Sequence, residues 1–311
     1  MTASPSPDDE THDESPHRPG GTPPGGARPD RTAHPMNRIS SRPAGRPGPV
    51  PLDRRRRPGP PALVVVAHGS RDPRALRTVN ALLEDVRGLR PGLPVHLGHI
   101  ELNEPLLSDT LAGLDAADTA DTAGAAGAEG AVLVPLLLSR GYHVRRDIPE
   151  AAAAARLRTR VAAPLGPHPL LVETLHDRLV EAGWRTPATD AERRTSAVVL
   201  AAAGSRDPDS AVDTGRTARL LADRLGVPVV PAYASTAAPT VPDAVRALAA
   251  RGRHRVAVAS CFTAPGRFAT ECAQAAPWIA SAPLGTHEAM ARLVLHRYDQ
   301  ARAATADSHA A

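Results

Sequence analysis

The sequence contains no lysine, so all 37 of its basic residues are arginine, and aromatic side chains are scarce. Phe, Tyr and Trp together make up only 2% of the 311 residues. A groove for nucleic acid needs aromatic platforms among its basic residues, and here acidic residues are interspersed with the arginines. We therefore expect no nucleic-acid partner, although the net charge is +4.

Cysteines are also few, since only Cys261 and Cys272 are present and they form no Cys-x-x-Cys pair. This excludes a disulfide framework and a zinc finger, and it favours a reducing compartment. No apolar run approaches the roughly 18 residues of a membrane span, and the acidic, Pro-rich N-terminus lacks the apolar core of a signal peptide. We expect a cytoplasmic protein that contacts no membrane.

The first 60 residues differ from the rest, because 14 of them are proline and few are apolar. Such a segment buries too little apolar surface to offset the entropy lost on ordering. The composition predicts a disordered Pro/Arg-rich tail at 1–60, an N-terminal lobe at 61–184, a linker at 185–195, a C-terminal lobe at 196–300 and a flexible tail at 301–311.

From residue 62 onward, short apolar runs alternate with segments of helical periodicity. We predict strands at 62–67, 95–102, 131–138, 161–163 and 196–203, helices at 73–89, 105–114, 148–160 and 170–182, and a helix end plus surface loop at 115–130. Such alternation is typical of an α/β fold whose mostly parallel sheet carries helices on both faces.

Two motifs occur twice and in the same order. Gly-Ser-Arg-Asp-Pro stands at 69–73 and 204–208, and Pro-Leu-Gly-x-His stands at 164–168 and 283–287. This repetition indicates an internal duplication that yields two similar lobes. Because ligands of such folds bind beyond the carboxyl ends of the strands, we expect the binding site in a cleft between the lobes.

Three polar residues lie at or just beyond the ends of the first three predicted strands of the first lobe, namely His68, Glu101 and His143. Since parallel strands end at one edge of the sheet, these side chains are expected to meet there. Two imidazoles and a carboxylate suit a borderline divalent metal and leave coordination positions open for exchange. The sequence therefore predicts a site that binds an ion and releases it.

Other candidates compete with these three. Glu104 precedes Pro105 and is more typical of a turn, whereas His99 shares a strand face with Glu101 and is a possible fourth participant. His168 and His287 belong to the duplicated motif, which favours a structural role in the turn.

The second lobe offers an internal comparison. Aligning the repeats places Ala203 opposite His68, Ser235 opposite Glu101, and Arg267, within one residue, opposite His143. All three proposed ligands are absent from the second lobe while the scaffold motifs persist. We therefore predict a single active site, in the first lobe.

Three segments carry a resemblance to a known family. These are Ala67-His68-Gly69-Ser70-Arg71, Ile100-Glu101-Leu102-x-x-Pro105, and Val134-Pro135-Leu136-Leu137-Leu138 followed by His143-Val144-Arg145-Arg146-Asp147-Ile148-Pro149. Together they resemble the CbiX-like sirohydrochlorin chelatases, strongly in the first lobe and weakly in the second. The resemblance implies ATP-independent insertion of Co²⁺ or Fe²⁺ into the tetrapyrrole sirohydrochlorin, for cobalamin or siroheme, with His68, His143 and Glu101 at the metal.

The resemblance also suggests roles for arginines, because the substrate is rich in carboxylates. Arg71, Arg140, Arg145 and Arg146 are predicted to bind those carboxylates, with a solvated surface as the alternative. Arg206 and Arg267 are candidates for the opposite side of the ring. Because metal binding needs neutral imidazole, insertion is expected to fall below about pH 6 to 6.5.

No Gly-x-x-x-x-Gly-Lys loop is present, which agrees with an enzyme that uses no ATP, and the unclustered cysteines predict no iron–sulfur cluster. Two other functions remain open. A histidine phosphatase needs Arg where this chain has Ala67, and a non-catalytic metal-delivery protein would bind the ion only. A hydrolase lacks its Gly-x-Ser-x-Gly elbow. Two fused lobes favour a monomer.

Overall fold

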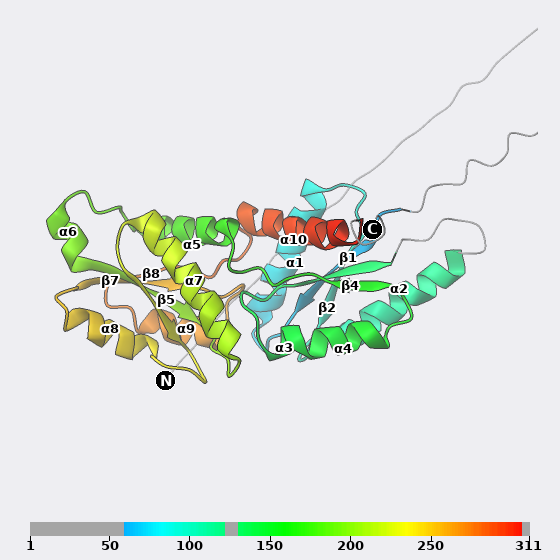
Figure 1. Ribbon diagram of the computed structural model, residues 1–311, viewed down its shortest axis with the longest axis horizontal. Helices are drawn as coiled ribbons and strands as arrows, with labels where there is room; N and C mark the ends of the chain where they lie inside the picture. Colours follow the sequence, from blue (N-terminus) through cyan, green and yellow to red (C-terminus); the bar gives the residue numbers. More distant parts are fainter. Residues whose placement is uncertain (1–58, 122–129, 307–311) are drawn as a thin grey trace, which may run out of the picture. The chain divides into compact units, whose positions relative to one another are not determined.

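The computed structural model describes residues 59–121 and 130–306. The predicted N-terminal tail up to residue 58, the centre of the predicted surface loop and residues 307–311 lie outside the described residues. The described part contains two four-stranded parallel sheets with flanking helices (Figure 1). We call the two halves that carry these sheets the N-lobe and the C-lobe.

The N-lobe sheet has the strand order β2-β1-β3-β4. Its strands are β1 (Ala62–Ala67), β2 (Val95–His99), β3 (Ala131–Pro135) and β4 (Thr159–Val161). Side chains of β1 alternate between two apolar layers, with Leu63 and Val65 in one layer and Val64 and Val66 in the other. Burial on both faces explains why this strand is a continuous apolar run rather than an alternating one.

The C-lobe sheet repeats this order as β6-β5-β7-β8. Its strands are β5 (Ser196–Ala202), β6 (Val229–Tyr233), β7 (Arg255–Ser260) and β8 (Ile279–Ala280). In each lobe the first strand lies between the second and the third, and every pairing is parallel. The predicted duplication and the α/β fold class are thereby confirmed.

The helices of the first sequence repeat depart from prediction mainly at their ends. They are α1 (Pro73–Leu89), α2 (Leu107–Asp121), α3 (Tyr142–Arg145), α4 (Asp147–Ala154) and α5 (Pro169–Glu181). The bounds predicted for α1 are confirmed, because Asp72 caps its first turn by accepting a hydrogen bond from the Arg74 N–H at 2.9 Å. The helix predicted at 148–160 ends at Ala154, because residues 159–161 pair with β3 as an edge strand.

Two boundary corrections concern the remaining segments. The helices of the second repeat are α6 (Asp190–Thr195), α7 (Pro208–Leu225), α8 (Val241–Ala249), α9 (Arg267–Gln274) and α10 (Glu288–Ala306). The predicted linker contains α6, which begins with a capping box between Thr189 and Glu192. The predicted C-terminal tail is helical through Ala306. Among the described helices, none combines the length and apolarity that crossing a bilayer requires.

The two lobes exchange helices, which the sequence boundaries did not predict. Helix α5 precedes the linker but packs against α7 and β7 of the C-lobe, whereas the last helix, α10, packs against α1 and β3 of the N-lobe (Figure 1). The Tyr298 hydroxyl of α10 donates to the Pro61 carbonyl at 2.6 Å, and Asp299 pairs with Arg90, the residue that caps the end of α1. One apolar layer consequently runs through both lobes.

The duplicated Pro-Leu-Gly-x-His motif builds the start of these two exchanged helices. His168 Nδ1 accepts from the Leu170 N–H at 3.1 Å, and His287 Nδ1 accepts from the Ala289 N–H at 3.2 Å. Each imidazole satisfies a backbone donor that the first helical turn leaves free. The structural role favoured for these histidines is therefore confirmed.

Candidate active site

The first two ligand candidates lie on neighbouring loops at the carboxyl end of the N-lobe sheet. The backbone of β1 continues to pair beyond the strand, because the Glu101 N–H donates to the His68 carbonyl at 3.1 Å. Gly69, with φ +101°, permits this approach, since a Cβ there would lie 1.8 Å from the Glu101 carbonyl oxygen. His68 Nε2 and Glu101 Oε1 stand 3.5 Å apart.

The third candidate, His143, reaches the same place from the short helix α3 behind β3. Its ring and the His68 ring meet edge to face, with centroids 4.7 Å apart and an interplanar angle of 90°. The predicted convergence of these strand ends thus brings all three residues together, although His143 sits on a helix turn rather than on a loop. The side chains remain 34%, 41% and 53% exposed for His143, His68 and Glu101, so an ion can reach them.

Both imidazoles have their Nδ1 atom engaged by the protein. His143 Nδ1 lies 2.5 Å from Asp147 Oδ2, and His68 Nδ1 lies 3.3 Å from the Gly69 carbonyl oxygen. A carbonyl or carboxylate oxygen accepts the Nδ1 proton, and the lone pair of each neutral ring is then on Nε2. Sequence reasoning missed Asp147, because its contact with His143 is made between two short helices, α3 and α4, and no helix was predicted to contain either residue.

His68 and His143 line a cavity of about 400 Å³ whose wall is shared by both lobes. The C-lobe contributes Ser205, Thr214, Phe262 and Phe268, among others, to this wall. Glu101 touches His68 but does not line the cavity. Within residues 59–121 and 130–306, no three His, Cys, Asp or Glu side chains are already arranged to hold an ion together. Joint coordination by the three candidates therefore requires a side-chain rotation.

The C-lobe repeats the scaffold of this site without its ligands. A Cβ on Gly204 would lie 2.0 Å from the Ser235 carbonyl oxygen, just as one on Gly69 would meet Glu101. The Ser235 N–H likewise donates to the Ala203 carbonyl at 3.0 Å. These contacts support the alignment of Ala203 with His68 and of Ser235 with Glu101.

The other acid and histidine near this edge take no part in the cavity. His99 is 2% exposed, and its Nδ1 lies 3.2 Å from the Pro105 carbonyl. Burial, only partly offset by that contact, holds the pKa of His99 below its ordinary value. Glu104 is exposed and precedes the turn at Pro105. We therefore retain neither residue as a ligand.

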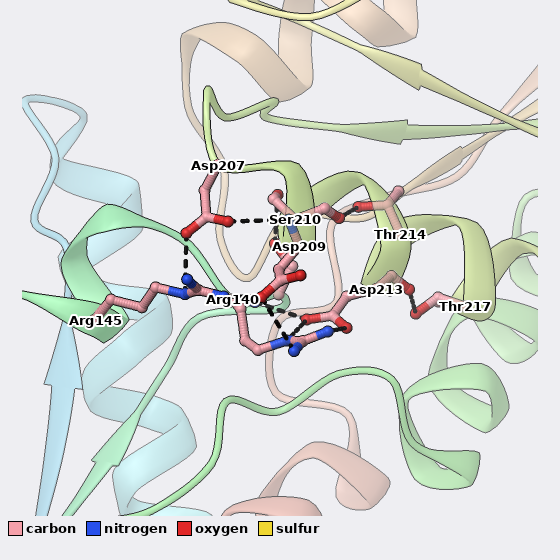
Figure 2. Close-up of polar contacts among 9 residues, drawn as sticks. Arg140, Arg145, Asp207, Asp209, Ser210, Asp213, Thr214 and Thr217 are labelled. Atoms are coloured by element: carbon pink, nitrogen blue, oxygen red, sulfur yellow. Dashed lines mark hydrogen bonds and ion pairs between the residues drawn. The ribbon is translucent and has the colours of Figure 1, made fainter.

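A network of ion pairs ties the segment around His143, which includes Arg140 and Arg145, to the start of helix α7 of the C-lobe (Figure 2). Arg140 donates to Asp213 from its backbone N–H (2.9 Å), from Nε (2.9 Å) and from Nη2 (2.7 Å). Ser139 Oγ also lies 3.0 Å from Ser210 Oγ. We call the Arg140–Asp213 pair the latch.

Asp213 of the latch is 2% exposed. Burial by itself would raise the pKa of this carboxyl. The hydrogen bonds and positive charge of Arg140 outweigh that effect and hold the pKa of Asp213 below its ordinary value. Asp213 is therefore ionised at neutral pH, and the latch is a charged pair.

Two of the arginines predicted to bind substrate are thus occupied elsewhere. Arg140 is taken up by Asp213, and Arg145 pairs with Asp209 and, at 3.1 Å, with Asp207 (Figure 2). Their guanidinium groups already face carboxylates, so we reassign both residues from substrate binding to contact between the lobes. Their partners lie more than 60 residues away in sequence, which is why no local pattern indicated these contacts.

The remaining candidate arginines are open to solvent. In the described part of the chain, Arg71 and Arg206 make no ion pair, and Arg146 has only a 3.8 Å contact with Glu150. Arg146 and Arg206 line a second cavity of about 680 Å³. Tyr142 and Ser205 belong to the walls of both cavities, so the second adjoins the first.

Comparison with known proteins gives one family match, which covers most of the described chain. The sequence model of the CbiX family matches residues 62–182 and 197–301. The sirohydrochlorin ferrochelatase of Bacillus subtilis is 29% identical over 185 residues, which cover 57% of this chain and 64% of that protein. The sirohydrochlorin cobaltochelatase of Methanococcus aeolicus is 33% identical over 89 residues, covering 29% of this chain and 56% of that protein.

Each alignment thus spans less than two thirds of the curated relative. Solved structures agree in fold over a larger share of the chain. SirB from Bacillus subtilis with Fe³⁺ superposes with a TM-score of 0.61 at 21% identity, covering 78% of this chain and 95% of SirB. A CbiX described as the terminal enzyme of siroheme biosynthesis in denitrifying bacteria gives 0.56 at 21% identity, covering 77% and 99%.

Proposed function

Because the chain belongs to the CbiX family, we propose that it is a chelatase that inserts Co²⁺ or Fe²⁺ into sirohydrochlorin without ATP. One observation carries the proposal: two imidazoles from separate strand ends meet on the wall of one open cavity. The relatives named as ferrochelatase and cobaltochelatase support both metals. Imidazole and carboxylate ligands suit either ion, so the ligand set does not choose between them.

In this proposal, His68 and His143 bind the incoming ion through Nε2. Asp147 and the Gly69 carbonyl hold the two Nδ1 atoms, which fixes the ring orientations. Glu101 is the third proposed ligand, because a rotation of its exposed side chain beside His68 would bring it to the ion. So few protein ligands leave positions through which the ion can pass to the pyrrole nitrogens.

Insertion also requires that the inner pyrrole N–H protons leave as the divalent ion enters. Glu101 is the proposed acceptor, since an exposed carboxylate can take a proton and pass it to solvent. His68 lies 3.5 Å from that carboxylate, which keeps the acceptor beside the metal. We therefore assign the catalytic role to the same three residues that bind the metal.

The carboxylates of the substrate need cationic partners outside the metal site. From the predicted arginines we propose Arg71, Arg146 and Arg206, because these three guanidinium groups are not taken up by close carboxylates. The second cavity, lined by Arg146 and Arg206, adjoins the first and is the proposed place for acidic substituents of the ring. Each of the two cavities is lined by residues from both lobes of the same chain. We therefore propose that a monomer is active.

The proposal is tested by mixing purified protein with metal-free sirohydrochlorin and Co²⁺ or Fe²⁺ under anaerobic conditions without nucleotide. Conversion of the substrate absorbance spectrum to that of the metallated ring, faster than in a protein-free control, is expected. A protein that binds Co²⁺ but leaves the spectrum at the control rate would be a metal-delivery protein, and the chelatase proposal would be wrong. Trapping of a phosphohistidine with phosphate-ester substrates would instead favour the phosphatase.

A further inference from the structure

Both phenylalanines of this 311-residue chain line the same cavity. Phe262 is the second residue after β7, which ends at Ser260, and Phe268 belongs to the first turn of α9. Tyr142 of the N-lobe lines the cavity too. In a chain with so few aromatic residues, this concentration at one cavity needs an explanation that is specific to the cavity.

The position of Phe268 corresponds to that of His143 in the other repeat. The N–H groups of Leu136 and Cys261 make the same bond to the first strand of their lobe, and five residues later each chain reaches an N-cap glycine with extended φ. Counting from Gly141 and Gly266 pairs His143 with Phe268, one residue away from the predicted partner, Arg267. Where one lobe presents a metal ligand, the other presents a phenyl ring.

Phe268 is not needed to fill the C-lobe core, because 38% of the residue is exposed. Phe262 is partly buried and packs on the C-lobe core, which fixes its position. Around them the C-lobe part of the wall is formed by small side chains, including Ala202, Ala203 and Thr263. The cavity therefore has two phenyl rings among small side chains on the C-lobe side and two imidazoles on the N-lobe side.

We propose that Phe268, together with Phe262 on the same cavity wall, is a platform on which the C-lobe binds one face of a planar conjugated macrocycle. Aromatic rings stack on extended π systems through dispersion and burial of apolar surface, and they do so without directional hydrogen bonds. The inference rests on the proposed function, and it gives the C-lobe, which has lost its metal ligands, a role in holding the substrate. His68 and His143, which would bind the ion, line the same cavity from the N-lobe side.

The test compares Phe268→Ala and Phe268→Trp with Leu220→Ala in the full-length protein. Leu220 is a matched control, since it is 41% exposed on α7 and does not line the cavity. Metal-free sirohydrochlorin is titrated into each protein and followed by its absorbance, and Co²⁺ is titrated separately without tetrapyrrole. We expect Phe268→Ala to raise the Kd for the tetrapyrrole roughly tenfold, with Phe268→Trp and Leu220→Ala close to wild type. Co²⁺ binding should be the same in all four proteins.

Different results would overturn different parts of the account. An unchanged tetrapyrrole Kd for Phe268→Ala would overturn the platform, while insertion by the wild-type protein would leave the chelatase proposal intact. A loss of Co²⁺ binding equal to the loss of tetrapyrrole binding would show that Phe268 acts on the metal site and would also overturn the platform. Wild-type protein that binds no tetrapyrrole would overturn both proposals.

Discussion

Arg140, three residues before His143, holds the buried carboxylate of Asp213 on the other lobe through three hydrogen bonds. One of these bonds comes from the Arg140 backbone, so the pair fixes the course of the chain as well as a side chain. The segment of the N-lobe that leads to His143 is thus held in place by the C-lobe.

Asp213→Asn tests this latch. The substitution leaves Arg140 facing a neutral, poorly matched partner, and we expect the free energy of unfolding to fall by about 2 to 4 kcal/mol. Co²⁺ affinity should fall as well, because the segment that leads to His143 is no longer held by the C-lobe. Urea unfolding and Co²⁺ titration measure the two effects.

The matched control is Asp299→Asn, which breaks the bidentate pair between Asp299 of α10 and Arg90 at the end of α1. That pair is more exposed and contributes about 0 to 1 kcal/mol. Its loss should leave Co²⁺ affinity unchanged. If both variants bind Co²⁺ like wild type, the latch does not position His143.

Asp147→Asn tests how His143 is oriented. The charged acceptor on Nδ1 would become a neutral amide, and we expect Co²⁺ affinity to fall about 10- to 100-fold with little change in stability. Glu150→Gln is the control, since Glu150 lies one turn further along α4 and is 68% exposed. Equal Co²⁺ affinities in the two variants would contradict an orienting role.

Gly69→Ala tests the close approach between the two ligand loops. The added Cβ would collide with the Glu101 carbonyl, and the alanine backbone would be held at a strained φ. We therefore expect the free energy of unfolding to fall by about 2 to 4 kcal/mol. Gly92→Ala separates the two causes, because Gly92 has φ +84° but no heavy atom within 4 Å of the place that a Cβ would occupy. That variant should lose only about 1 kcal/mol. Equal losses by thermal unfolding would show that the Glu101 approach imposes no constraint.

The caps of the exchanged helices predict a dependence of stability on pH. Burial first, and then the charges of Arg297 and His296, lower the pKa of His168 to about 4. The unfolded chain, with an ordinary histidine pKa of about 6.5, binds this proton more readily, so stability falls as pH drops from about 6.5 to 4.

His168→Asn should flatten this part of the pH profile, since Asn can cap a helix without titrating. Urea unfolding at several pH values between 7 and 4.5 measures the slope for wild type and variant. His254→Asn, at an exposed site, serves as the control and should keep the wild-type slope. If His168→Asn keeps the full wild-type slope, groups other than His168 cause the loss of stability at low pH.

The sequence predicted what depends on local pattern. Apolar runs located the central strands. The alternation of strands with helices indicated a parallel sheet, and from it we predicted that His68, Glu101 and His143 lie at one edge, where the structure has them. Contacts across the lobes were beyond local reasoning, because Arg140 and Asp213 are 73 residues apart and their charges fit a solvated surface equally well. The exchange of α5 and α10 escaped for the same reason, since the sequence of neither helix indicates against which sheet it packs.

Smaller errors came from the segments between strand and helix. The position opposite His143 was predicted only to within one residue of Arg267, a margin that includes Phe268, because the repeats share little sequence in that segment. Asp147 was placed in a motif but given no role, since the helix containing it was predicted to begin one residue later. In both cases a backbone contact, rather than a side-chain pattern, fixes the register.

The most direct test of the account is the initial rate of Co²⁺ insertion into sirohydrochlorin by His68→Ala and His143→Ala. His254→Ala serves as a control for the loss of an exposed imidazole, and circular dichroism checks that each variant is folded. The account predicts that both cavity variants fall to the protein-free rate while His254→Ala keeps the wild-type rate. Wild-type rates in both folded cavity variants would contradict it.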